Sequence, residues 1–385
     1  MSGTLKVTTL QDGGSSTANL VFDTNANTTA GGTVAMSSSF KRNRIINGNM
    51  VIDQRNAGAS VATSSGTFIY TVDRWQAIYA ATSKYTIQQN AGSVTLPAGF
   101  TKYLGVTSTS AYTPSSTEYF AVRQFIEGYN TADLAWGAAS AKAVTLSFLV
   151  YSSLTGSFGG ALVNSAQTRS YPFTYSVPVA NTWTTISITV PGDTTGVWAT
   201  DNATGIDLRL GLGCGSTYNG TAGAWAAGNY VSVTGAVSVV GTSGATFYIT
   251  GVQLEVGTKA TPYEMQIYSD QLAQCQRYFS KSYNIDVVPG TATYVGALAT
   301  FSPTASTNRP VVPIFFPVSM RTTPTLTAYS PNNGASGNFY NNDAAANFAV
   351  QVSVNTGSSG ASWLPSGTLT TNAFFTGHWT ATAEL

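Results

Sequence analysis

The sequence predicts an all-β protein, and three observations carry that prediction. Only 9% of the 385 residues are charged, with 17 Lys and Arg against 16 Asp and Glu. The surface must therefore be made of Ser, Thr, Asn, Gly and Tyr, which favour strands and turns. Hydrophobic residues make up 43% of the chain, enough for a packed core. Apolar and polar residues also alternate repeatedly with a period of two, which is typical of strands buried on one face.

Residues 1–40 differ from the rest of the chain. They contain few large apolar side chains, and runs rich in Gly, Ser, Thr and Asn separate these. Such a stretch cannot bury enough surface to offset the entropy that it loses on ordering. We expect an extended amino-terminal arm without a core of its own, ordered by neighbouring subunits or by another protein.

Residues 41–265 are predicted to form a β-sandwich or barrel. The clearest alternating runs lie at 144–150, 186–190, 206–212 and 252–256. Turn signals between the runs, such as Pro191-Gly192-Asp193, are spaced as in a sandwich or barrel and not as in βαβ units. No period of 20–50 residues recurs, which argues against a solenoid or β-helix.

One segment, residues 266–279, has the pattern of a helix. Tyr268, Leu272, Cys275 and Phe279 follow one another at spacings of four, three and four, on one helical stripe. Two starts are compatible with the sequence: a capping box at 261–264 with Pro at the first helical position, or a simple cap at Ser269. We expect this to be the single substantial helix, connecting the sandwich to a second β domain.

Residues 280–385 are predicted to form that second, smaller β domain. Strand patterns resume at 311–318 and 325–329, and the chain ends on a further strand pattern at 374–382. The fold class is therefore all-β, with an amino-terminal extended arm, a β domain over 41–265, a connecting helix and a smaller carboxy-terminal β tip domain.

Charge and composition exclude several functions. A net charge of +1 leaves no basic surface for the phosphates of nucleic acid. No stretch approaches 18 consecutive apolar residues, and the start lacks the pattern of a signal peptide, so we expect neither membrane insertion nor conventional export. The two cysteines, Cys214 and Cys275, are too few for a disulfide framework and are interpreted as buried free thiols.

Catalytic chemistry finds little support. The single histidine, His378, has no Gly-x-Ser-x-Gly elbow to pair with and is interpreted as a hydrogen-bonded structural residue. Asp53, Asp73 and Asp207 each lie close in sequence to an arginine (Arg55, Arg74 and Arg209), which favours structural ion pairs over glycosidase chemistry. We therefore expect no enzymatic activity and no cofactor.

We expect no metal, although one alternative stays open. The oxygen-bearing residues Asp193, Asp201, Asn202 and Asp207 cluster in predicted loops, and a jelly roll can hold Ca²⁺ between such groups. Their spacing matches no EF-hand.

Aromatic residues near polar turns give the most plausible function. Trp183, Trp198, Tyr218 and Trp225 lie beside Thr-, Asn- and Gly-rich segments and not within alternating core runs. Sugar rings stack their CH faces on aromatic planes, and neutral amides and hydroxyls bind their OH groups. These four residues are the candidates for glycan binding. The alternative for each tryptophan is an ordinary place in the core of the sandwich.

Several motifs resemble those of one family. They are RIINGNMVIDQRN at 44–56, Asp73-Arg74-Trp75, the segments 170–172, 191–198 and 247–257, Ala260-Thr261-Pro262-Tyr263-Glu264, and Cys275-Gln276-Arg277-Tyr278-Phe279. Together they resemble the jelly-roll domain of bacteriophage tail-fibre and receptor-binding proteins. The segments 280–283, 317–321 and 324–327 are similar to the distal tip region of these proteins, so the resemblance spans roughly 40–385.

The resemblance implies a carbohydrate-binding-module-like jelly roll, carried in a homotrimeric fibre without enzymatic activity. It transfers no sugar-contacting residues. Together with the coreless arm and the uncharged β-rich body, it leads us to expect a location on the virion, on tail or capsid. We expect attachment to other virion proteins through residues 1–40 and to a host-surface polysaccharide through the β domains. Alternatives are an architectural collar, decoration or capsid-fibre component and a polysaccharide depolymerase.

A threefold fibre also offers the predicted helix a place to bury its apolar stripe. Tyr268, Leu272, Cys275 and Phe279 are therefore candidates for the trimer interface. The alternative is packing of the helix on the sheet of its own subunit.

Overall fold

The computed structural model describes residues 41–63, 68–302, 312–365 and 373–385, together with the backbone of three short strands nearer the amino terminus. The chain divides into two compact units, Met1–Arg42 and Asn43–Leu385. In the first unit, β1 (Thr9–Leu10), β2 (Leu20–Phe22) and β3 (Thr28–Thr29) pair as an antiparallel sheet. The rest of the predicted arm, residues 1–40, lies outside the described residues.

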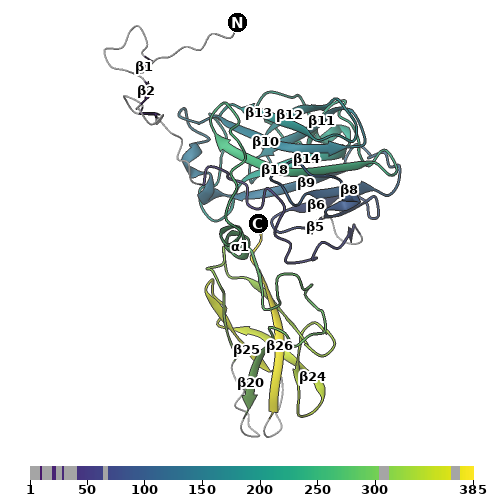
Figure 1. Cartoon of the computed structure of the whole chain (residues 1–385), viewed down its shortest axis with the longest axis vertical. Helices are drawn as coiled ribbons and strands as arrows, with labels where there is room; N and C mark the ends of the chain where they lie inside the picture. Colours follow the sequence, from purple (N-terminus) through teal and green to yellow (C-terminus); the bar gives the residue numbers. More distant parts are fainter. Residues whose placement is uncertain are drawn as a thin grey trace. The chain divides into compact units, whose positions relative to one another are not determined.

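The second unit contains a sandwich of two mainly antiparallel sheets, which confirms the all-β prediction (Figure 1). The six-stranded sheet has the order β13 (Thr184–Val190), β10 (Val144–Ser152), β18 (Thr246–Val256), β8 (Leu104–Ser108), β7 (Tyr85–Gln89), β4 (Val61–Ala62). The seven-stranded sheet has the order β16 (Ala226–Ala227), β12 (Arg169–Val177), β11 (Gly156–Val163), β14 (Thr204–Cys214), β9 (Tyr119–Glu127), β6 (Gln76–Tyr79), β5 (Phe68–Tyr70). A short parallel pair, β15 (Asn219–Gly220) with β17 (Ser232–Val233), lies in the long connection from β14 to β18.

The alternating pattern decides which side chains enter the core. In β10 the side chains of Val144, Leu146, Phe148 and Val150 are buried between the sheets, while the residues between them face outward, as the pleat of a strand requires. Leu146 lies opposite Ile188 of β13 and Leu254 of β18, so the inward faces of three strands are in register. Burial of these side chains is the main stabilising term of the sandwich.

The motif at 44–56 forms no strand and is instead a buried loop. The Asn47 amide donates to the carbonyls of Ile52 and Asp73 and accepts from the Ile52 N–H. The indole N–H of Trp75, which is fully buried, donates to the Asn47 carbonyl at 3.1 Å. Buried backbone groups need hydrogen-bond partners. In this loop the side chains of Asn47 and Trp75 provide them, whereas in a β-sheet the neighbouring strand would do so.

The helix α1 spans Tyr268–Gln276, so it is shorter than the predicted 266–279. Its N-cap is Ile267, which has no capping side chain, and both predicted starts were wrong. Thr261 instead bonds the Glu255 carboxylate, and Ser269 lies within the first turn. At the other end, Phe279 already belongs to β19 (Phe279–Lys281).

The carboxy-terminal part is built around the long strand β26 (Ala373–Thr382), drawn in yellow in Figure 1. β26 pairs with β19, β20 (Leu298–Ser302), β22 (Thr325–Tyr329) and β23 (Asn338–Asn341). The sheet continues through β24 (Ala346–Val354), β25 (Gly360–Pro365) and β21 (Val312–Phe315). Its separate core includes Met320, Leu326, Phe339, Trp363 and Trp379.

A set of charged side chains joins this part to the sandwich. Arg277, just after α1, donates to both oxygens of Glu127 at the end of β9, at 2.6 and 2.9 Å, and the Tyr278 hydroxyl donates to the same carboxylate at 2.6 Å. Near the chain end, Glu384 accepts from Arg74 and, at 2.8 Å, from Arg55. The two β parts are therefore connected through buried or half-buried ion pairs.

We predict that Gly48→Ala destabilises the protein by about 3 kcal/mol. A Cβ at position 48 would lie 2.1 Å from the Val252 carbonyl oxygen, and the Val252 N–H donates to the Gly48 carbonyl at 2.9 Å, so the two backbones cannot separate freely. Urea unfolding followed by tryptophan fluorescence measures the change. Gly357→Ala is the matched control, because the nearest atom to a Cβ there is 4.0 Å away. Equal stabilities of the two variants would contradict this account.

We also predict that Glu127→Gln lowers the melting temperature at neutral pH and that the difference from wild type narrows in acid. Burial pushes the pKa of Glu127 up, but the hydrogen bonds from Arg277 and Tyr278 outweigh it and hold the pKa below the ordinary 4.5. A carboxylate with a depressed pKa in the folded state stabilises above its unfolded pKa and loses that effect as the pH falls through the folded pKa. Melting curves recorded between pH 7 and about pH 3, where carboxylates titrate, test this. A difference in melting temperature that stays constant over this range would contradict the prediction.

Candidate functional site

The four aromatic candidates for glycan binding lie on three separate surfaces of the sandwich. Trp198 and Trp225 adjoin each other near one end of the seven-stranded sheet. Tyr218 lies in the turn Ser216–Tyr218 and packs on Tyr119, with ring centroids 4.5 Å apart. Trp183 precedes β13 of the six-stranded sheet. The structure therefore does not bring the four together into one site.

Trp198 and Trp225 are packed against a third tryptophan, Trp136, which the sequence analysis did not single out. The three rings meet edge to face, with centroids 4.7 to 5.3 Å apart. The Trp198 indole N–H donates to Asp193, and that of Trp225 donates to the Pro191 carbonyl. Because the rings cover one another and their polar edges are occupied, this cluster stabilises the fold and offers little face to a sugar.

Trp183 lies on the outer face of the six-stranded sheet in an aromatic cluster. Its ring contacts Tyr103 at 5.8 Å and Tyr151 at 5.5 Å between centroids, and its indole N–H donates to the Thr95 carbonyl at 2.8 Å. Tyr151 is an outward residue of β10, and Leu149 and Ser147 are the next outward residues along that strand. Along the outer face of β10, an aromatic side chain (Tyr151) is thus followed by an aliphatic one (Leu149) and then by a hydroxyl (Ser147).

A groove continues this face, with a volume of about 210 Å³. We call it the aromatic groove and define it by Phe100, Ser147, Leu149, Thr185 and Tyr263. The rings of Phe100 and Tyr263 are 5.4 Å apart between centroids. No charged side chain lines the groove. Its surface is therefore mainly apolar, with hydroxyls from Ser147, Thr185 and Thr261, which suits an uncharged ligand that has both CH faces and OH groups.

A bulge in β18 shapes the floor of the groove. The pairing of β10 with β18 shifts register between Ser147 and Leu149, and Gly251 at this point has a φ of +62°. A Cβ on Gly251 would lie 2.8 Å from the Phe100 ring. Glycine is therefore required both by the backbone and by the close approach of Phe100.

Phe100 and Tyr263 were not predicted as site residues. Phe100 follows a Pro-Ala-Gly loop, and Tyr263 belongs to the segment interpreted as a possible capping box. The two lie far apart in the sequence, and only the folded structure brings them together. The only feature in the sequence that could have identified them is that each is an aromatic residue in a polar loop. This feature does not show which loops meet in the folded protein.

The charged and catalytic candidates take structural positions. Within the described residues no group of three or more His, Cys, Asp or Glu side chains could hold a metal ion. Of the four considered for calcium, Asp193 binds Arg169 and Trp198, and Asp207 binds Arg209. Asp201 caps the Ala203 N–H, and Asn202 donates to the Arg321 carbonyl.

His378 is fully enclosed. Its Nδ1 is 2.9 Å from the Ser282 hydroxyl, its Nε2 is 2.9 Å from the Thr293 carbonyl, and its ring stacks on Tyr283 at 3.7 Å. Burial lowers its pKa, although the hydrogen bond to Thr293 opposes that shift. With both ring nitrogens occupied and no exposed surface, it is a hydrogen-bonded structural histidine.

Two of the predicted ion pairs have other partners. Asp73 pairs with Arg55 at 3.0 Å and not with Arg74, which pairs with Glu384. Asp53 accepts the N–H groups of Asn56 and Gly58 and makes a turn within its own loop. Only the pair of Asp207 with Arg209, at 2.7 Å, joins the partners expected from sequence.

The candidates for the trimer interface are mostly covered by their own chain. Cys275 is fully buried, and Phe279 is buried beneath the Arg55 guanidinium, which lies 3.9 Å from its ring centroid. Leu272 packs partly against the cluster of Ile46, Ile52, Cys275 and Tyr278. Tyr268 is 49% exposed. Of the four, Tyr268 and part of Leu272 are accessible to a second subunit.

No helix within the described ranges combines the length and the apolar character that crossing a bilayer requires.

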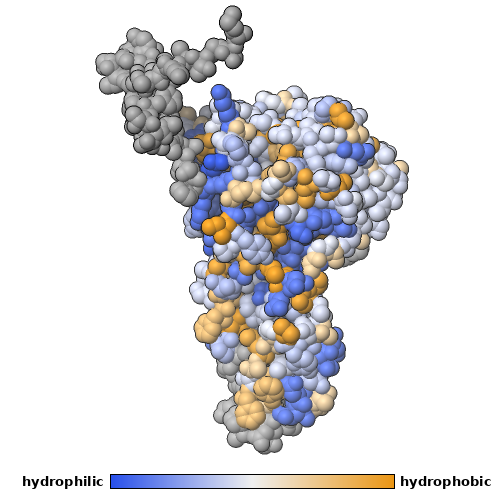
Figure 2. Space-filling model, viewed as in Figure 1, coloured by the Kyte–Doolittle hydropathy of each residue, from blue (hydrophilic) through white to orange (hydrophobic). Residues whose placement is uncertain are grey.

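The surface of the sandwich is largely of intermediate hydropathy, and Figure 2 shows small apolar areas scattered among polar ones on the face in view. This agrees with a surface built from Ser, Thr, Gly and Tyr.

Comparison with known proteins gives remote likenesses only. No family model matches the sequence, and no curated protein matches it. Similar solved structures include a putative sugar binding protein from Bacteroides thetaiotaomicron (TM-score 0.31, 11% identity), over 56% of this chain and 100% of that one. They also include a family 11 carbohydrate-binding module from Clostridium thermocellum in complex with a mixed-linked tetrasaccharide (TM-score 0.25, 13% identity), over 52% and 98%.

A third similar structure is the enzymatically active domain of tailspike protein 4 of bacteriophage CBA120, with a TM-score of 0.30 and 11% identity. It covers 56% of this chain, but this chain spans only 22% of its length. Likenesses of this size carry no argument about what the chain binds. The assignment of a site therefore depends on the geometry of the chain itself.

Proposed function

We propose that the protein is a non-enzymatic glycan-binding protein that uses the outer face of its six-stranded sheet. The observation that supports this most directly is the aromatic groove, in which the adjoining rings of Phe100 and Tyr263 share one surface with Leu149 and with the hydroxyls of Ser147 and Thr185. The neighbouring pair of Trp183 and Tyr151 extends the aromatic surface along β10.

The chemistry of the groove favours an uncharged glycan. A pyranose ring presents apolar CH groups on its faces and hydroxyls around its edge, which matches aromatic walls and Ser and Thr hydroxyls. An anionic glycan would lose hydration in a groove that offers no cation in exchange, and this is costly. We therefore expect neutral polysaccharides to bind in preference to acidic ones.

We further propose that the protein is a virion fibre, homotrimeric, attached by residues 1–40 to other virion proteins and exposing its β domains to a host surface. The motifs at 44–56 and 247–257, with their resemblance to phage tail-fibre proteins, support this reading. Two alternatives differ in what they predict. An architectural virion component would bind no host glycan, and a depolymerase would release reducing ends from host capsule or lipopolysaccharide.

The glycan proposal predicts that Phe100→Ala weakens binding to a neutral polysaccharide about tenfold, which corresponds to the loss of one stacking contact. The probe is an array of bacterial surface polysaccharides, and affinity is then measured by electrophoresis in gels containing the glycans that bind. Phe68→Ala is the matched control, because Phe68 is an exposed phenylalanine on β5, away from the groove. Failure of the wild type to bind any neutral glycan, or equal affinity of both variants, would overturn the proposal.

The fibre proposal predicts a trimer in solution and loss of the protein from particles when residues 1–40 are deleted. Light scattering on the purified chain measures the first, and immunoblotting of purified virions measures the second. A stable trimer should stay assembled at micromolar protein concentration. If light scattering shows a monomer there, the proposal of a homotrimer is wrong. Retention of the truncated protein on virions would exclude attachment through the arm.

A further inference from the structure

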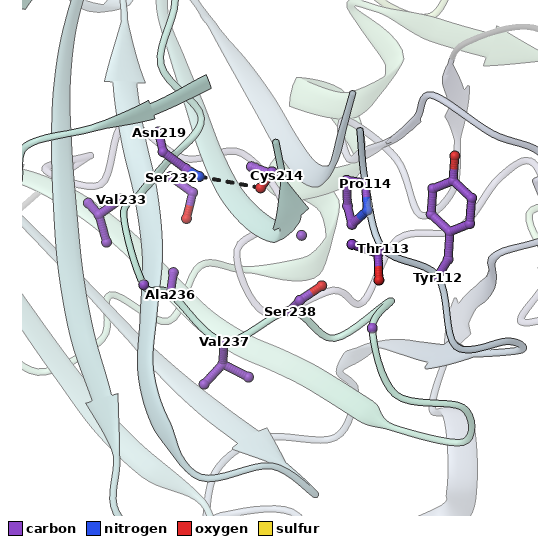
Figure 3. Close-up of a pocket in the computed structure, with 13 residues that line it drawn as sticks. Tyr112, Thr113, Pro114, Cys214, Asn219, Ser232, Val233, Ala236, Val237 and Ser238 are labelled. Atoms are coloured by element: carbon purple, nitrogen blue, oxygen red, sulfur yellow. Dashed lines mark hydrogen bonds between the residues drawn. The ribbon is translucent and has the colours of Figure 1, made fainter. Parts of the chain in front are cut away.

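A second hollow lies at the other sheet of the sandwich and shares no residue with the aromatic groove. It has a volume of about 250 Å³ and is formed where the loop carrying Tyr112, Thr113 and Pro114 meets the connection from β14 to β18 (Figure 3). We call it the loop pocket. Its remaining lining comes from the end of β14 at Gly213 and Cys214, from Asn219, and from residues between 232 and 241.

Two hydroxyls in the loop pocket have no partner in the part of the chain that the structure describes. Ser232 is only 3% exposed, yet no hydrogen bond joins its hydroxyl to another described residue. The Ser238 hydroxyl oxygen is buried and also unpartnered. Buried polar groups are almost always hydrogen-bonded, so the unpartnered Ser238 oxygen indicates that a partner comes from outside the chain. The Ser232 hydroxyl lines the same pocket and is available to such a partner.

Asn219 adds an amide to the same pocket. Its Nδ2 donates to the Cys214 carbonyl at 3.3 Å, a contact drawn as a dashed line in Figure 3, and this fixes the plane of the amide. The amide oxygen makes no hydrogen bond with another described residue. The pocket therefore offers one fixed acceptor and two hydroxyls, each of which can donate and accept.

The remaining lining is neutral and small. Burial raises the pKa of the Cys214 thiol to about 12, so this group is uncharged at neutral pH. Tyr112 already has partners within the chain, because its hydroxyl donates to Glu118 and the Lys84 ammonium lies 4.6 Å from its ring centroid. Val233, Val237 and Pro114 supply apolar surface.

We propose that the loop pocket is a binding site for a single uncharged sugar ring, such as the terminal residue of a glycan. Ser232, Ser238 and Asn219 would bind its hydroxyls, and Val233, Val237 and Pro114 would cover its CH face. The volume lies just below the roughly 300–1,000 Å³ of sites for drug-sized ligands, which fits one ring and not a chain of them. The proposal rests on glycan binding as the function of the protein, but not on the aromatic groove.

The absence of charge in the lining predicts selectivity. An ionised sugar would give up hydration of its carboxylate or phosphate and find no Lys or Arg among the lining residues. Neutral monosaccharides should therefore bind and acidic ones should not.

The test uses the full chain and saturation-transfer NMR with methyl glycosides of glucose, galactose and N-acetylglucosamine, and with glucuronic and N-acetylneuraminic acids for comparison. We expect at least one neutral glycoside to bind with a Kd of about 1 mM and the acids to show no transfer. Ala236→Leu, which fills the pocket, should abolish binding, and Ser232→Ala should weaken it about tenfold. Ala224→Leu and Ser176→Ala are matched controls, because both positions are exposed and outside the pocket lining.

The outcomes separate the two sites. If Phe100→Ala abolishes monosaccharide binding and Ala236→Leu leaves it unchanged, the ring binds in the aromatic groove, which overturns the loop-pocket proposal and leaves the glycan proposal standing. Absence of transfer to every neutral glycoside at about 10 mM, meaning that the pocket holds only water, also overturns it. Circular dichroism and melting curves confirm that each variant is folded before it is scored.

Discussion

A buried loop must find hydrogen-bond partners for its backbone. The loop at 43–58 meets this requirement through contacts with both sheets of the sandwich and with the segment after α1, and these contacts hold the parts of residues 43–385 together. Asn43 and Asn47 bond the loop to itself and to β18, and Gln124 of β9 receives and donates a hydrogen bond at Ile46. Gln54 then reaches the Phe279 carbonyl, and Lys281 reaches back to the Gln54 carbonyl. One loop without strands thus connects both sheets to the segment that leads into the carboxy-terminal part.

Charge is scarce in this chain, and several of the acidic groups that it has are placed in the interior. Asp73, Glu127, Asp193 and Asp207 are all nearly or fully buried, and each has an arginine partner. Such pairs add little net stability compared with apolar residues, but removing one partner is costly, so they fix which segments meet. The two proposed binding sites are correspondingly neutral, so we expect any ligand interaction there to depend little on salt.

The sequence allowed the architecture to be predicted because the strands follow a local rule. The alternation in β10, β13, β14 and β18 identified their inward residues, and burial of Leu146, Ile186 and Leu254 agrees with it. The ends of α1 were missed because neither cap candidate is used, and the chain enters the helix from extended backbone at Ile267. Local pattern carries information about periodicity and much less about where a segment stops.

The candidate site was predicted less well, for a physical reason. Trp183 lies beside the groove, but Trp198 and Trp225 fill space against Trp136, and nothing in their immediate sequence distinguishes the two situations. Arg55 and Arg74 likewise find partners, Asp73 and Glu384, that depend on long-range approach. Pairings of this kind are set by how loops and sheets meet.

The strand β26 has a mechanical consequence. It is hydrogen-bonded to four other strands, and the residues that follow it are held by Arg55, Arg74 and Arg321 at the boundary with the sandwich. A pull along this strand would load many backbone hydrogen bonds in shear at the same time, instead of opening them one after another. Tension applied to the carboxy-terminal part would therefore reach the sandwich through a stiff element.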